Sequence, residues 1–159
     1  MRIGITGHMN ITAATVPLVY SEIVRLLTDA PDQAELVGVS CIARGADSVF
    51  AQAVLNVGGR LEVVLPSRNY RERKVKPDHA NQFDELLRRA ETVHVMDFDD
   101  AGRPAYEAAN EVILGCDRLI AVWDGEPAVD GSGTGSVVAI AQRRGLPVVI
   151  VWPVGAERA

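Results

Sequence analysis

Short apolar runs alternate along the chain with longer stretches in which apolar residues recur at helical spacing. Most of the short runs are continuous, without polar alternation, which is typical of strands buried on both faces of a sheet. The pattern predicts six strands, at Arg2–Thr6, Leu36–Ile42, Leu61–Leu65, Thr92–Met96, Arg118–Val122 and Pro147–Val151.

The stretches between these runs predict five helices, at Ala14–Thr28, Asp47–Val57, His79–Ala90, Ala105–Leu114 and Gly135–Arg144. Glycines follow the second and the last of them, where a left-handed residue commonly ends a helix. Strands that alternate with helices predict a doubly wound α/β fold: a mostly parallel sheet of about six strands with helices on both faces.

Composition fits one soluble domain over residues 1–159, with enough residues to bury a core. The net charge of −5 disfavours general nucleic-acid binding, because phosphate backbones select basic surfaces. The longest apolar run, near Val148–Trp152, is far shorter than a membrane span, and no signal peptide is visible. We expect a cytoplasmic protein whose Cys41 and Cys116 are reduced core thiols, with no metal site.

In an open parallel sheet, ligands bind outside the carboxyl ends of the strands, where the strand order reverses. Three turns with glycine follow predicted strands and should therefore meet at one rim. They contain Thr6-Gly7-His8 after the first strand, Ala43-Arg44-Gly45-Ala46-Asp47 after the second, and Trp123-Asp124-Gly125 with the loop Gly131-Ser132-Gly133-Thr134-Gly135 after the fifth.

The loop from Gly131 to Gly135 is the strongest of these elements. Its glycines let the backbone approach a ligand, and the helix that follows directs free amides and a positive dipole end at the same place, which suits a phosphate. It is not a Walker A loop, because no Gly-Lys-Ser/Thr sequence follows. A flexible surface loop would have the same composition, so phosphate binding and a plain connection both remain open.

The other two turns also have two interpretations each. Arg44 could hold a phosphate or carboxylate, or pair with Asp47 at the surface, while Asp47 could cap the next helix. His8 could donate to a ligand at the rim or be a packed residue. The basic stretch Arg68–Lys76 is either a solvated connection or a basic flap over an anionic ligand.

Three segments together resemble a known superfamily. The opening RIGITGHMNIT, the stretch ARGADSVFAQAVLNVGGRLEVVLP and the stretch CDRLIAVWDGEPAVDGSGTGSVVAIAQRRGLPVVIVWP are similar to the SLOG superfamily. It joins the DNA-processing proteins of natural transformation to the LOG-like phosphoribohydrolases, once misnamed lysine decarboxylases, and the molybdenum-cofactor carrier proteins look similar too. The resemblance covers essentially the whole chain.

The resemblance implies a Rossmann-like fold, frequent homodimers and a pocket for a nucleotide or nucleotide-derived cofactor. Matched position by position, it implies ligand contacts at Thr6, Gly7, His8, Arg44, Gly45, Ala46, Asp47, Asp124, Gly125, Gly131, Ser132, Gly133, Thr134 and Gly135.

The chain departs from the phosphoribohydrolases at two places. Val137 and Val138 occupy the region of their catalytic glutamate, and Ala109, Asn110 and Glu111 that of an arginine-lysine pair. We therefore expect a domain that binds or senses a nucleotide-derived ligand; the alternative is a nucleoside-monophosphate phosphoribohydrolase or a related N-glycosidic enzyme. A DNA-handling role is disfavoured by the charge.

A homodimer is expected from the resemblance, and the predicted helix Ala105–Leu114 offers a surface for it. Its small residues at Ala105, Ala108 and Ala109, with Val112, permit close approach of another helix. The alternative is that this stripe simply covers the sheet.

Overall fold

The computed structural model describes residues 1–29, 35–127 and 133–159. Six strands form a single sheet with the order β4-β3-β2-β1-β5-β6, and every neighbouring pair is parallel. The strands are β1 (Arg2–Gly7), β2 (Val37–Ser40), β3 (Arg60–Leu65), β4 (Thr92–Val95), β5 (Arg118–Val122) and β6 (Val148–Val151). The predicted doubly wound α/β fold is confirmed, and the sheet is parallel throughout.

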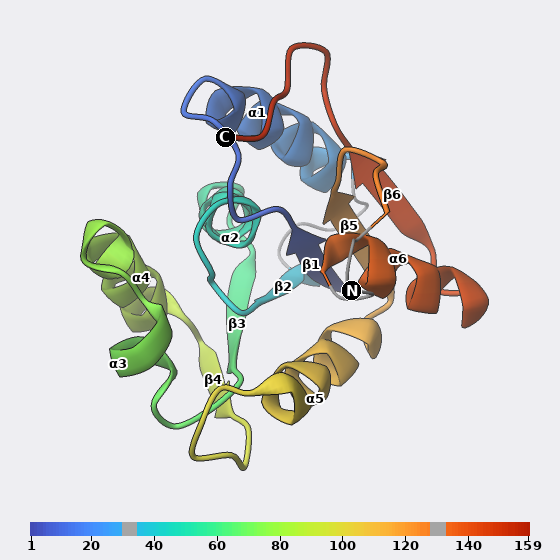
Figure 1. The fold of residues 1–159 in the computed structure, drawn as a ribbon. Coiled ribbons are helices and arrows are strands. Elements are labelled where there is room, and N and C mark those ends of the chain that lie inside the picture. The colour runs from blue at the N-terminus through green and yellow to red at the C-terminus, as the bar shows by residue number, and fades with distance from the viewer. Residues whose placement is uncertain (30–34, 128–132) are drawn as a thin grey trace.

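Six helices cover the sheet within the described ranges. They are α1 (Thr15–Thr28), α2 (Ala46–Asn56), α3 (Tyr70–Lys74), α4 (Pro77–Arg89), α5 (Arg103–Leu114) and α6 (Thr134–Arg143). Figure 1 shows α1, α2, α3 and α4 on one face of the sheet and α5 and α6 on the other. The chain first builds the sheet outward from β1 to β4 and then returns to place β5 on the other side of β1. Crossovers between parallel strands are right-handed, so this change of direction moves the connecting helices to the other face of the sheet.

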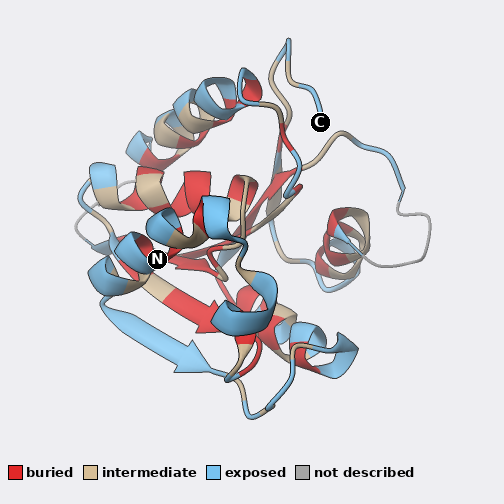
Figure 2. Ribbon diagram, turned by 60° about the vertical axis from the view of Figure 1, so that its left-hand side comes forward, coloured by how far each residue is buried: buried red, intermediate tan, exposed pale blue. Residues whose placement is uncertain are grey.

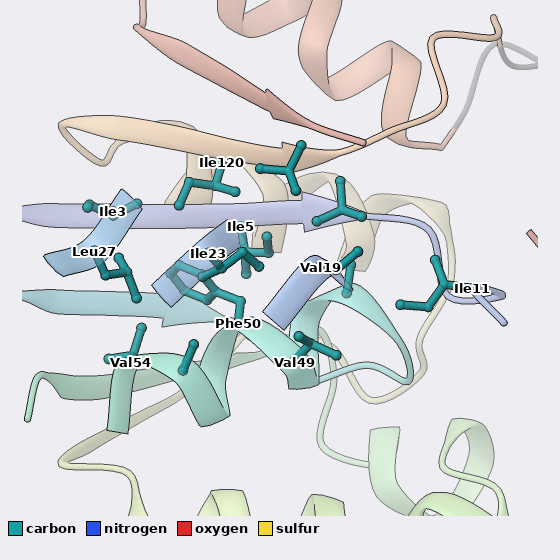
Figure 3. Packing of buried hydrophobic residues seen from close by; sticks show 14 of the residues in the cluster. Ile3, Ile5, Ile11, Val19, Ile23, Leu27, Val49, Phe50, Val54 and Ile120 are labelled. Carbon is teal, nitrogen blue, oxygen red and sulfur yellow. The ribbon is translucent and has the colours of Figure 1, made fainter. Parts of the chain in front are cut away.

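The first face is closed by α1 and α2. Val19, Ile23 and Leu27 recur at helical spacing on α1 and are wholly buried against α2 and the central strands. Figure 3 shows Phe50 and Val54 of α2 packed into the same layer. On the opposite face, small residues of α5 and α6 allow these helices to lie close to β1 and β5. The two layers hold the carboxyl ends of the strands in fixed positions.

Two expectations from the sequence differ from the structure. The short helix α3 was not predicted, because five residues rich in charge carry no helical stripe. Strand β4 was expected to be buried, yet all four of its residues are exposed, as the strand drawn wholly in pale blue in Figure 2 shows. It lies at the edge of the sheet, where no further strand of the described chain follows and α5 does not reach.

The predicted element boundaries are otherwise correct to within a few residues. Helix α4 begins two residues early, because Pro77 fits the first turn of a helix, whose amides have no partner within it. Cys41 and Cys116 are free thiols, as expected, and burial raises the pKa of both; that of Cys116 rises to about 11. No helix in the described ranges is long and apolar enough to cross a membrane.

Candidate functional site

A crevice of about 690 Å³ opens at the carboxyl end of β1, between α5 and α6. The strand order reverses between β1 and β5, so this is the switch point at which open α/β sheets bind ligands. Its described lining comes from the end of β1, from α5 and the turn before it, and from α6: Thr6, Gly7, Ala101, Gly102, Arg103, Tyr106, Glu107, Asn110, Gly133, Thr134, Ser136, Val137 and Ile140.

Gly7 is required at the floor of this crevice for packing reasons. A Cβ at this position would lie 2.5 Å from the Cβ of Ala46 and 2.9 Å from that of Val122. Both distances are shorter than real carbon contacts, so any side chain would push β1 away from α2 and β5. The absence of a side chain at Gly7 therefore lets α2 and β5 pack closely against the end of β1.

The amino end of α6 forms one wall. Gly133 occupies the N-cap position with a φ of 87°, a left-handed conformation that favours glycine, and as a glycine it has no side chain with which to cap the helix. Thr134 and Val137 continue this wall along the first turn. Amides in the first turn of a helix have no partner within it, and together with the helix dipole they make such an end attractive to an anion.

The opposite wall belongs to α5, which sequence reasoning missed. The guanidinium of Arg103 lies 3.2 Å from the carboxylate of Glu107, and both side chains border the crevice. Tyr106, whose pKa is raised by burial and by the nearby Cys41 thiol, lies beside them, as does Asn110. These residues could have been found from topology: α5 enters from the carboxyl edge of the sheet, so its first turns must lie at the rim.

Gly45 shapes the turn after β2. Its φ of 80° is left-handed, and a Cβ there would lie 2.6 Å from the carbonyl oxygen of Met9. The amide of Ala46 donates to the carbonyl of His8 at 3.2 Å. The backbones of the turns after β1 and β2 are therefore in direct contact. The sequence predicted that these turns lie together, because both follow strands that end at the same edge of the sheet.

Arg44 and Asp47 lie outside the described lining of the crevice. Arg44 pairs with Asp78 at the start of α4 and borders a different cavity. Asp47 does not cap α2, because Gly45 holds the N-cap position and Asp47 lies in the first turn. Burial raises the pKa of Asp47 to about 7, although the amide of Ala43 donates to its carboxylate and opposes the rise.

His8 is buried, and its ring connects two turns. Its Nε2 accepts a hydrogen bond of 3.1 Å from the amide of Asp124, and its ring meets that of Trp152 edge to face. Burial, reinforced by the charge of Arg158, lowers the pKa of His8, although the Asp124 carboxylate, 3.3 Å from Nε2, opposes this shift. An Nε2 that accepts from a backbone amide carries no proton. Sequence reasoning had left open whether His8 points to the rim; the structure places its ring inside.

The predicted glycine loop is only partly described. Gly131 and Ser132 lie outside the described residues, while Gly133 and Thr134 line the crevice. Gly135 lies behind this wall, where a Cβ would come within 3.3 Å of the Trp123 ring. Gly125 has a φ of 87° in the turn after β5 and does not appear in the described lining. No group of acidic, histidine or cysteine residues suited to a metal ion occurs in the described ranges.

These features define a Rossmann-like α/β protein with a ligand-sized crevice at its switch point. Solved structures with the same fold include DNA processing protein A (DprA) of Streptococcus pneumoniae, with a TM-score of 0.67 and 20% identity over 96% of this chain and 50% of that chain. The DprA of Helicobacter pylori has a TM-score of 0.68 and 16% identity, over 99% of this chain and 68% of that chain.

The Moco carrier protein of Chlamydomonas rheinhardtii is a third neighbour, with a TM-score of 0.53 and 16% identity over 94% of this chain and 74% of that chain. No protein-family model and no curated protein sequence matches the chain. The chain thus has the fold of DprA and the Moco carrier protein, as the resemblance of its sequence implied, and it spans half the length of the S. pneumoniae protein.

Proposed function

We propose that the chain binds a nucleotide or a nucleotide-derived, phosphorylated cofactor in the crevice between α5 and α6. The observation that carries the proposal is the meeting of three features at one place: the switch point of the sheet, the amino end of α6 with glycine at its N-cap, and a crevice of about 690 Å³. That volume lies within the range of small-molecule and cofactor sites.

The chemistry of the walls divides the ligand into two parts. The amino end of α6, with Gly133 and Thr134, suits a phosphate. The wall of α5 offers the Tyr106 ring and the Asn110 amide, which suit a planar heterocycle with hydrogen-bonding edges. Two fold neighbours are named for ligands of related chemistry, single-stranded DNA and Moco.

The test is calorimetric titration with AMP, with adenosine as the ligand that lacks the phosphate. Gly133→Val places a β-branched side chain at the mouth of the phosphate site and should weaken AMP binding at least about tenfold. Gly58→Val is the matched control, because Gly58 has the same φ of 87° and a Cβ there would contact nothing. Gly58 follows the carboxyl end of α2, away from the crevice. This control variant should bind AMP as the wild type does.

A second variant separates binding from folding. Thr134→Asp adds a carboxylate to the first turn of α6, where the helix dipole favours it, so the variant should be at least as stable as the wild type. The same charge should repel a phosphate and abolish AMP binding. Unchanged affinity in both crevice variants would contradict the proposal, as would equal affinity for AMP and adenosine.

Hydrolysis of an N-glycosidic bond is the second candidate, and Glu107 is the observation that favours it. It is the one acidic side chain in the described lining of the crevice, although it is paired with Arg103. Val137 occupies the α6 wall, where the related hydrolases would have their glutamate. We expect no release of adenine when AMP is incubated with the protein and followed by chromatography. Release that disappears in Glu107→Gln would establish the enzyme instead.

A further inference from the structure

A second cavity, of about 330 Å³, lies at the carboxyl rim on the opposite side of β1 from the crevice. Its walls are the turns after β1 and β2, the segment from α3 to the start of α4, and Ala159 beside the first turn. The residues that matter for its chemistry are Ile11, Arg44, Tyr70, Lys74, Val75 and Lys76. None of the described residues that line it also lines the crevice. We call it the lysine cavity.

The distribution of basic residues singles out this cavity. The chain has fourteen arginines but only two lysines, Lys74 and Lys76, and both line it. Neither ammonium group has a hydrogen bond or ion pair with the described residues. The neighbouring arginines differ, because Arg68 pairs with two aspartates and Arg71 forms two 2.7 Å hydrogen bonds with Asp84. Among the described residues, Arg73 and the two lysines of this stretch have no ion pair, and of these three cations only the lysines border the cavity.

Tyr70 provides a second polar group with an unsatisfied hydroxyl. The residue is only 5% exposed and lines the cavity, yet its hydroxyl has no hydrogen-bond partner in the described part of the chain. Burial, and then the nearby Asp47 and Cys41, raise the pKa of Tyr70, so the hydroxyl stays protonated and able to donate. No buried side-chain oxygen of the described residues lacks a partner, so this hydroxyl is accessible from the cavity and free to donate to an acceptor on a ligand.

The charge balance indicates the kind of anion. Arg44 is compensated by its ion pair with Asp78, which leaves the two lysines as the uncompensated charged side chains of the lining. Two positive charges match a phosphate monoester, which carries about two negative charges at neutral pH, better than a single carboxylate. Ile11 and Val75 add apolar surface for an organic part of the ligand, and the volume lies at the lower end of the range for small-molecule sites.

We propose that the lysine cavity binds a small phosphate monoester through Lys74, Lys76 and the Tyr70 hydroxyl, independently of the crevice between α5 and α6. The basic stretch Arg68–Lys76 then closes over an anion at its carboxyl-terminal half, while its first arginines hold the stretch in place through the aspartates. The amino end of α4, which begins at Pro77, faces the same space and adds its dipole.

The first experiment uses the scarcity of lysine. The protein is treated with an amine-selective acetylating reagent, and the acetylation of Lys74 and Lys76 is followed by peptide mass spectrometry. The N-terminal amine serves as the internal reference. Ribose 5-phosphate should slow acetylation of both lysines at least about threefold in a saturable manner, whereas ribose should not.

Calorimetric titration with ribose 5-phosphate then assigns the site. Lys74→Gln combined with Lys76→Gln should weaken binding at least about tenfold. Arg73→Gln is the matched control, because it removes a positive charge from the same helix at a residue that does not line the cavity. Gly133→Val should retain the binding, so failure of this site and failure of the crevice are distinguishable.

Two results would overturn the inference. One is the absence of saturable protection by ribose 5-phosphate, glycerol 3-phosphate and AMP up to about 10 mM. The other is an equal loss of affinity in Arg73→Gln and in the double lysine variant, which would reveal only nonspecific attraction to a basic segment.

Discussion

At the scale of single residues, the rim is shaped by glycines whose roles differ. Gly7 is needed because β1 runs close to α2 and β5, Gly45 because two turns meet backbone to backbone, and Gly133 because α6 starts from a left-handed residue. The sequence places all three at or after the ends of predicted strands but does not distinguish these reasons. The reasons become distinct only from the atoms that a Cβ at each position would meet, and those atoms belong to distant parts of the chain.

Gly45 permits a test of the contact between the two turns. Gly45→Ala should lower the free energy of unfolding by at least about 3 kcal/mol, since a left-handed conformation and overlap with the carbonyls of His8 and Met9 act together. Gly58→Ala keeps the positive φ in open surroundings and should cost only about 1–2 kcal/mol. Urea denaturation measures both. Equal costs would mean that the turns move apart easily.

At the scale of elements, alternating patterns predicted every strand and five of the six helices, because burial on two faces leaves long apolar runs in the sequence. The candidate site was predicted less completely. Thr6, Gly7, Gly133 and Thr134 meet in one crevice, whereas Arg44 lies at the lysine cavity and His8 is buried. The direction in which a turn presents its side chains depends on packing between turns, which a pattern along one chain does not contain.

His8 couples two of these elements, the turns after β1 and β5, through its hydrogen bond from Asp124. Because burial lowers the pKa of His8 in the folded protein, its contribution to stability is present above the unfolded pKa of about 6.5 and is lost as the pH falls below it. His8→Gln keeps an acceptor but does not titrate. Between pH 8 and pH 5, the wild type should therefore lose about 1 kcal/mol more stability than the variant.

Chemical denaturation of both proteins at the two pH values measures this difference in the free energy of unfolding. The contributions of the other titrating groups are common to both proteins and cancel. The same loss in both proteins would mean that the ring accepts a proton without breaking the connection between the turns.

At the scale of the whole molecule, the small residues of α5 that the sequence offered as a dimer surface are buried inside the protein instead. Ala105 and Ala109 are at most 1% exposed and pack against the sheet, which is the alternative that the sequence left open. The edge strand β4 is the better candidate, because Val93 and Val95 are 42% and 48% exposed beside an unpaired strand edge.

We propose a homodimer in which β4 pairs antiparallel with β4 of a second copy about a twofold axis through His94. This register puts Val93 of one copy opposite Val95 of the other. Light scattering should give the mass of a dimer for the wild type and of a monomer for Val95→Lys. Ile150→Lys on β6 is the control at the same 48% exposure and should remain dimeric. A monomeric wild type would exclude the dimer.

The parallel order of the sheet also has a consequence for synthesis of the chain. The central strand β1 is made before the other strands of the sheet. Its neighbour β5 pairs Arg118 with Ile3 and Val122 with Gly7, so β5 emerges from the ribosome some 115 residues later. At roughly 5–20 residues per second, the nascent chain waits about 6–23 s with one side of β1 unpaired. During that interval α5 has no completed sheet to cover, and the crevice forms only after β5 and α6 have been synthesised.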